Sequence, residues 1–198
     1  MTQTNTIYEI HVHGDVPLRR DISPEQIEEV LKPLWSFAGA ASLREGAASL
    51  FEEEPGLVFD MKDYTLRICW TAQGDESFNQ VAEEFCLKLN EVAREGAPIE
   101  VSYFDSDDDS AEDEFQLYFV GPSAQAIIQT QRDLLVKDVI DVMERHFDAS
   151  ELSGIAAEID RLFKERMNQL EKSPSSMNTL WSGITFSNAD SAVKRRLH

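Results

Sequence analysis

The order of strand-like and helix-like patterns in the first 121 residues constrains the fold of this chain most. Residues 7–13 and 64–71 alternate apolar and polar side chains, as strands with one buried face do. Between Ile27 and Phe37, and again between Phe78 and Val92, apolar residues instead recur at helical spacing. The two kinds of pattern therefore alternate along the chain, which indicates a mixed α+β domain.

Shorter patterns complete the order of elements. Residues 47–71 predict a hairpin that turns at Lys62-Asp63, and residues 99–103 and 115–120 predict two further strands. The order is then β-α-β-β-α-β-β, and its first six elements match the ferredoxin-like arrangement. We therefore expect the first and third strands to lie side by side in an antiparallel sheet, two helices to cover one face, and the fifth strand to extend an edge.

Local signals predict where several elements begin and end. Ser23 and Gln26 form a capping box ahead of the first helix. Pro33 is expected to kink or end that helix, and Gly14-Asp15 to end the first strand. Gly96 is expected to cap the second helix.

The C-terminal third predicts a helical hairpin over residues 122–172, packed on the sheet domain of residues 1–121. The first helix runs from Pro122-Ser123 to about His146, and its apolar arc covers roughly two-thirds of the circumference. Such a helix must pack on two partners. One is the sheet or its helices; the other is the next helix, which starts at the capping box of Asp148 and Glu151, or a second copy in a homodimer.

Residues 173–198 are rich in Ser and Asn and predict a flexible tail. The alternative is a docking segment, with three large apolar anchors and a basic end. Those residues are Trp181, Ile184, Phe186, Lys194, Arg195 and Arg196.

Charge is unevenly distributed along the chain, whose formal net charge is −19. Residues 1–150 contain 31 acidic and 11 basic side chains, whereas residues 151–198 contain 6 and 7. An acidic body repels nucleic acid and anionic membranes and attracts basic surfaces. Solubility is the simple interpretation, and docking on a basic protein or a nucleic-acid-binding complex is the sharper one.

Seven of the ten residues from 105 to 114 are acidic, in the loop of a predicted hairpin. A calcium-binding EF-hand loop needs Gly at its sixth position and Glu at its twelfth, where this chain has Ser110 and Gln116. The EF-hand motif therefore fails, which leaves a solvated flexible loop, a loop that recognises a basic partner, or weak binding of a divalent ion as the alternatives. The candidate partner-binding residues are Asp105, Asp107, Asp108, Asp109, Glu112, Asp113 and Glu114, together with Glu52, Glu53 and Glu54 of another loop.

His11 and His13 are two residues apart on a strand and so share a face, as two imidazole ligands of one metal ion can. In the ferredoxin-like layout Cys69 of the third strand lies on that face and is a candidate third ligand. Arg67 is expected there too and disfavours a cation. The other interpretations are a polar outer face or an interface with the C-terminal helices.

Signals of catalysis and of location are sparse. The chain has no GxSxG elbow, no HExxH and no glycine-rich phosphate loop, so we predict neither an enzyme nor a cofactor. No apolar run approaches membrane-spanning length, the N-terminus has no secretion signal, and two cysteines do not make a disulfide framework. These features predict a cytoplasmic protein with no membrane and no direct nucleic-acid contact.

The leading hypothesis is an acidic, non-enzymatic interaction protein that binds a basic protein surface. One version is a nucleic-acid mimic that inhibits a DNA- or RNA-binding complex. The alternative is a small regulatory domain that binds a metal ion or another ligand on the open sheet face around His11, His13, Arg67 and Cys69.

Overall fold

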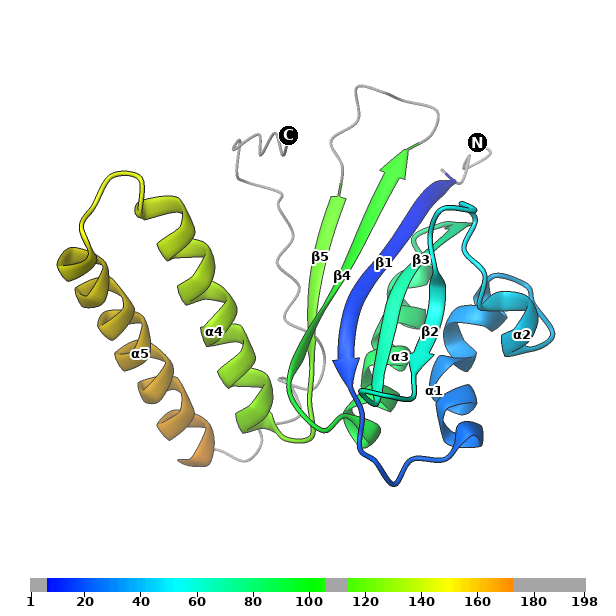
Figure 1. Ribbon diagram of the computed structural model, residues 1–198, viewed down its shortest axis with the longest axis horizontal. Coiled ribbons are helices and arrows are strands. Elements are labelled where there is room, and N and C mark those ends of the chain that lie inside the picture. Colours follow the sequence, from blue (N-terminus) through cyan, green and yellow to red (C-terminus); the bar gives the residue numbers. More distant parts are fainter. Residues whose placement is uncertain (1–6, 106–113, 173–198) are drawn as a thin grey trace, which may run out of the picture.

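The computed structural model describes residues 7–105 and 114–172 (Figure 1). The described strands form one sheet in the order β2-β3-β1-β4-β5, and every neighbouring pair is antiparallel. The strands are β1 (Tyr8–Pro17), β2 (Gly56–Asp60), β3 (Thr65–Gly74), β4 (Ala97–Asp105) and β5 (Glu114–Val120). The helices are α1 (Pro24–Phe37), α2 (Leu43–Gly46), α3 (Phe78–Val92), α4 (Ala124–Met143) and α5 (Ala149–Lys172).

This topology confirms the predicted α+β fold. Strands β1 and β3 are neighbours inside the sheet, and β5 extends the edge beside β4. The helices α1 and α3 pack against each other and cover one face. A C-terminal helical pair, α4 and α5, follows the ferredoxin-like core.

The core lies between the sheet and the helices α1 and α3. On the sheet side, Ile10, Ile68 and Trp70 are at most 2% exposed, and α3 contributes Phe78 and Phe85 from above. The indole Nε1 of Trp70 donates a hydrogen bond of 3.0 Å to the carbonyl oxygen of Gly46 in α2. The residues between these buried ones point to the other side of the sheet, which α1 and α3 do not cover. We call that side the open face.

Two residues that were predicted to interrupt an element do not end it, and distant residues accommodate both. Strand β1 continues past Gly14 to Pro17; a Cβ at Gly14 would lie 2.7 Å from Ile99 Cδ1, so glycine here allows β4 to approach. Pro33 is buried inside α1 and does not end it. The carbonyl that the proline leaves without its helical donor belongs to Glu29, and Lys88 Nζ donates to it at 3.3 Å.

Gly96 also has a different role from the one predicted. Helix α3 ends at Val92, and Ala93 is its cap residue. A Cβ at Gly96 would lie 2.0 Å from Thr130 Oγ1 and 2.6 Å from the Ala126 carbonyl oxygen. Glycine at this position therefore lets α4 lie directly against the start of β4.

In the hairpin predicted over residues 47–71, the first strand is short. Only Gly56–Asp60 forms β2, and the four-residue helix α2 precedes it without having been predicted. The segment between them still reaches β3, because the amide of Leu50 donates to the carbonyl oxygen of Thr71 at 2.9 Å. This hydrogen bond places residues 49–54 beside the open face of the sheet.

The α4–α5 hairpin touches the sheet mainly at its base. Helix α4 contacts β4, β5 and α5, which gives its wide apolar arc the two partners that the sequence predicted. Only Ile127, Ile128 and Gln131 of α4 are buried, and from residue 132 to residue 168 no side chain is buried. Figure 1 shows why, since the hairpin diverges from β5 as α4 rises.

Both capping boxes are present. At α1 the Ser23 hydroxyl accepts from the Gln26 amide, and the Gln26 side chain accepts from the Ser23 amide. At α5 Asp148 and Glu151 make the same reciprocal pair. No described helix is long and apolar enough to cross a bilayer, and the tail predicted at residues 173–198 lies outside the described part of the chain.

Candidate functional site

The open face of the sheet carries the residues that the sequence placed there. In the antiparallel register His13 lies opposite Cys69 and His11 lies opposite Thr71, so all four side chains share this face. Arg67 lies further along β3, opposite Asp15. The period-two alternation of β1 and β3 is thus sufficient to bring these residues together.

A hydrogen-bonded cluster forms around Glu54, whose side chain is 17% exposed. The buried Thr71 hydroxyl donates to Glu54 Oε2 at 2.7 Å, and the Ser49 hydroxyl donates to the same oxygen. Ser49 Oγ in turn accepts from the Thr71 amide at 2.8 Å. His11 Nδ1 lies 3.2 Å from Thr71 Oγ1 and 3.5 Å from Glu54 Oε1. We call Ser49, Glu54, Thr71 and His11 the Glu54 cluster.

Aromatic rings flank the imidazole of the Glu54 cluster. The ring of Phe104 meets His11 edge-on at a centroid distance of 4.9 Å, and the ring of Phe51 lies 5.8 Å away. The Nδ1 atom of His11 faces Thr71 and Glu54, and its Nε2 makes no hydrogen bond within the described residues. The arrangement can present one oriented ring nitrogen to a ligand between two phenyl rings.

The thiol of Cys69 belongs to the same surroundings. Burial, followed by the negative charge of Glu54, raises the pKa of the Cys69 thiol above its ordinary value. The thiol is therefore less able to form the thiolate that metal binding and nucleophilic catalysis require. Cys86 is buried in the core, and burial raises the pKa of its thiol strongly.

The proposed metal ligands do not converge. Among the described residues, no three His, Cys, Asp or Glu side chains are close enough to hold a metal ion together, and His11, His13 and Cys69 are all described. The guanidinium of Arg67 is half exposed and pairs with Asp60 at 3.2 Å and with Asp63 at 3.7 Å. Arg67 is thus engaged with these two aspartates and forms no ion pair with Glu54 beside His11.

Of the acidic residues predicted to bind a partner, some lie in the described part of the chain and some lie outside it. Asp105 ends β4 and Glu114 begins β5, whereas Asp107, Asp108, Asp109, Glu112 and Asp113 lie outside the described residues. In the other loop Glu52 and Glu53 are exposed. Glu54 differs from the expected solvent-facing acid, because the hydroxyls of Ser49 and Thr71 hold it against the sheet.

The structure shows a further acidic surface that the sequence analysis did not single out. The exposed side of α1 and α3 carries six glutamates against two lysines, and we call it the acidic helix layer. Its members are Glu25, Glu28, Glu29, Glu83, Glu84, Glu91, Lys32 and Lys88. The sequence could have predicted this surface, because in each helix these residues occupy the positions that lie outside the apolar stripe.

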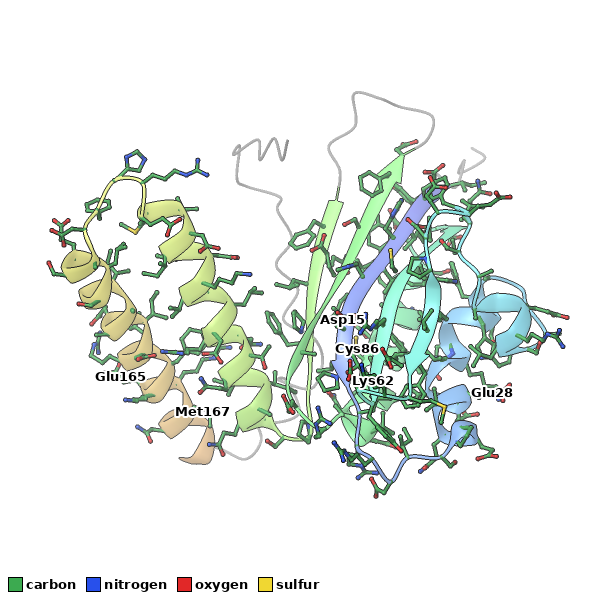
Figure 2. All side chains as sticks on the ribbon, in the orientation of Figure 1. Asp15, Glu28, Lys62, Cys86, Glu165 and Met167 are labelled. Carbon is green, nitrogen blue, oxygen red and sulfur yellow. The ribbon has the colours of Figure 1, made fainter. Side chains whose placement is uncertain are left out.

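The two lysines of the acidic helix layer are already paired. Lys88 Nζ lies 2.9 Å from Glu29 Oε1 and 3.4 Å from Glu84 Oε1, and Lys32 Nζ lies 3.6 Å from Glu29 Oε2. The hydrogen bond from Lys88 lowers the pKa of Glu29 below its ordinary value. Glu28, Glu83 and Glu91 make no ion pair within the described residues, and Figure 2 shows Glu28 on the outer side of α1.

An open depression of about 560 Å³ lies at the end of α3. Its polar groups are largely engaged, since Asn90 Oδ1 accepts from the Gly121 amide at 2.8 Å and Arg19 pairs with Asp21 at 3.4 Å. It is lined by Arg19, Leu87, Asn90, Glu91, Ala93 and Pro122. The depression therefore offers little free chemistry of its own.

Comparison with known proteins gives one relationship. No curated protein and no solved structure matches the chain. A family model, described as a family of unknown function (DUF6806), matches residues 8–164, from the start of β1 into α5. The match spans the sheet domain and most of the hairpin, and the chain therefore belongs to this family of unknown function, DUF6806.

Proposed function

We propose that this chain is a non-enzymatic interaction protein of the cytoplasm, whose acidic sheet domain binds a basic protein surface. The observation that carries the proposal is the acidic helix layer. Its two lysines are paired with Glu29 and Glu84, so the remaining carboxylates present a negative surface without internal compensation. Such a surface attracts a basic partner over a distance and orients it before contact.

The location of charge also supports this function. Residues 1–121 contain 26 acidic and 8 basic side chains, whereas residues 122–172 contain 10 and 7. A chain that needed acidity only for solubility could distribute it over both parts. Here the sheet domain has most of the excess, which suits a docking surface on one part and a different role for the other.

The test begins with affinity capture at low salt and elution at high salt, which identifies electrostatic partners. A captured partner is then purified, and its binding is measured with the Glu28→Gln/Glu83→Gln/Glu91→Gln variant. The matched control removes three charges from the hairpin, in the variant Asp141→Asn/Glu144→Gln/Glu165→Gln. We expect the helix-layer variant to raise the Kd by about tenfold or more, mainly through slower association, and the control to change it by less than about twofold.

Two outcomes would contradict the proposal. If both variants weaken binding equally, only the net charge matters and the helix layer has no special role. If neither does, the acidity serves solubility. A nucleic-acid mimic, the more specific version, further requires that DNA or RNA compete with this protein for the captured partner.

A second candidate function uses the open sheet face, and the Glu54 cluster favours it. Glu54 and Thr71 orient His11 between Phe51 and Phe104, as a small ligand-binding domain would need. The readout is the NMR shift of the His11 imidazole in a screen of small ligands. A ligand that shifts His11 and Phe104 in the wild type but not in Glu54→Gln would support this function over the first.

The hairpin is the remaining contact surface. We propose that it supports self-association, because its apolar side chains are only partly covered by the sheet domain. This contact is separate from the acidic helix layer, as Figure 2 shows by the positions of Glu28 on α1 and Glu165 on α5.

A further inference from the structure

We infer that one side of the α4–α5 hairpin binds the same side of a second copy of this chain, so that two hairpins form a bundle of four helices. This side is defined by Leu135 and Val142 of α4 and by Ile155 and Leu162 of α5, and we call it the hairpin stripe. This surface specifies the self-association proposed above, and it rests on that proposed function and not on the docking of a basic partner.

The stripe begins inside the protein and continues into solvent. Ile128, Leu135 and Val142 are spaced by seven residues, so they follow one line along α4 with a drift of about 20° per step. Ile128 is 2% exposed against the sheet domain, whereas Leu135 is 44% exposed and Val142 is 58% exposed. The change follows from the divergence of the hairpin from β5 (Figure 1). The first apolar residue has a partner, and the next two do not.

Helix α5 adds to the same side. The ion pair of Arg132 with Asp160 links the two helices. We take the half-buried Val139 and Ile159 to mark the sides on which the helices face each other, and we call this line the seam. In an antiparallel pair the two helices turn in opposite senses when viewed from one end. Measured from the seam, Leu135 and Leu162 are therefore rotated toward the same side. Leu162 is 51% exposed.

A spacing of seven residues on each helix suits helix-on-helix packing. Side chains at this spacing stay in register with a helix that crosses at about 20°, as in most four-helix bundles. A two-fold axis lets each hairpin stripe supply the apolar surface that the other needs. An exposed apolar side of two helices is otherwise costly to keep in water.

The distribution of charge favours a second copy of this chain as the partner that covers the hairpin stripe. Two sheet domains repel each other, because residues 1–121 have 26 acidic and 8 basic side chains. The hairpin has a much smaller acidic excess, 10 acidic against 7 basic side chains in residues 122–172, and displays both signs, as in the pairs of Arg161 with Glu158 and Glu165. The hairpin diverges from β5 along its length (Figure 1), which leaves room beside the hairpin stripe for a second hairpin. The hairpin is thus the part through which this acidic chain can approach itself.

The experiment measures the mass of the full chain by sedimentation equilibrium at concentrations up to about 200 µM. We expect the wild type to reach twice the chain mass of 22.4 kDa. The variant Leu135→Glu/Leu162→Glu should raise the dimer Kd at least about tenfold. The matched control is Leu50→Glu/Leu87→Glu, which adds the same charge at leucines that are 47% and 46% exposed on the sheet domain. The control should change the Kd by less than about twofold.

Each remaining outcome decides the question. Circular dichroism checks that the double variant folds, and Val142→Glu replaces it if it does not. A wild type that stays monomeric overturns the inference, as does a double variant that dimerises as tightly as the wild type. If only a chain ending at Lys172 dimerises, the C-terminal residues of the same chain occupy the hairpin stripe, which also overturns it. The experiment uses no basic partner, so its result is independent of the proposed docking function.

Discussion

The sheet domain and the α4–α5 hairpin differ in what stabilises them. In the sheet domain the large side chains Trp70, Phe78 and Phe85 are at most 1% exposed, and they are held by contacts between residues far apart in the sequence. The hairpin has no buried side chain between residues 132 and 168. One chain therefore combines a part that folds around a core with a part that depends on local signals and on whatever covers its apolar side.

The local signals of the hairpin are numerous but individually weak. Arg161 pairs with Glu158 and Glu165 one turn away on either side, and all three side chains are more than half exposed. Such exposed pairs contribute little to stability because water and salt screen them. We therefore expect the hairpin amides to exchange with solvent well before those of the sheet.

The largest expected effect tests the core of the sheet domain. Trp70→Ala removes a side chain that is 1% exposed, together with its hydrogen bond to Gly46, and should lower the free energy of unfolding by about 4 kcal/mol. Phe163→Ala removes a half-buried ring from the hairpin and should cost about 1.5 kcal/mol. Urea denaturation followed by circular dichroism measures both. Equal losses would mean that the hairpin is as well packed as the sheet domain.

The junction between the two parts gives the next largest effect. Gly96→Ala places a methyl group 2.6 Å from the Ala126 carbonyl oxygen, so the backbone of α4 must move, at a cost of about 2 kcal/mol. Gly154→Ala is the matched control, because a Cβ there meets nothing within 4 Å and alanine favours a helix by about 0.5–1 kcal/mol. The two variants should therefore change stability in opposite directions. A neutral Gly96→Ala would show that the base of α4 is loosely attached.

A smaller effect concerns the start of α5 and its dependence on pH. The Ser150 hydroxyl, followed by the amides of Glu151 and Ser150, lowers the pKa of Asp148 below its ordinary value. A lowered pKa contributes stability above the unfolded pKa of about 3.9, and that stability is lost as the pH falls through the folded pKa. Asp148→Ala should lower the Tm by a few degrees at pH 7, and the difference should shrink toward pH 3. Asp141→Ala, which removes an exposed acid outside the cap, should not show this convergence.

Sequence patterns predicted the sheet well because its order depends on short-range periodicity. Alternation in β1 and β3 placed His11, His13 and Cys69 on one face, and the register confirms it. Two of the errors involve a distant partner. Gly14 continues its strand because Ile99 packs against it, and Pro33 stays inside α1 because Lys88 satisfies the Glu29 carbonyl. Local rules contain no information on such partners.

The candidate site shows the same limit. Glu54 stood in a run of three glutamates and was expected to face solvent like Glu52 and Glu53. Its position depends on the irregular segment before β2, which the Leu50–Thr71 hydrogen bond draws onto the edge of β3. Only a pairing of residues about 20 positions apart turns this carboxylate inward. The acidic helix layer, by contrast, required only the helical spacing that the sequence already showed.

The smallest expected effect uses the two cysteines to compare the open face with the core. Cys69 is partly exposed beside Glu54, and its pKa is raised by burial and by that carboxylate, so its alkylation by iodoacetamide should be slow at pH 8 and speed up as the pH rises. Glu54→Gln removes the negative charge, which favours the thiolate, lowers the pKa and should raise the alkylation rate about twofold at pH 8. Cys86 is the internal control: it is buried in the core and should react only when the sheet domain unfolds. If Glu54→Gln leaves the Cys69 rate unchanged while Cys86 stays protected, Glu54 does not act on this thiol and the open face is more solvated than its hydrogen bonds indicate. If Cys86 reacts as fast as Cys69, the core of the sheet domain is as accessible to the reagent as the open face, and the contrast between the two is wrong.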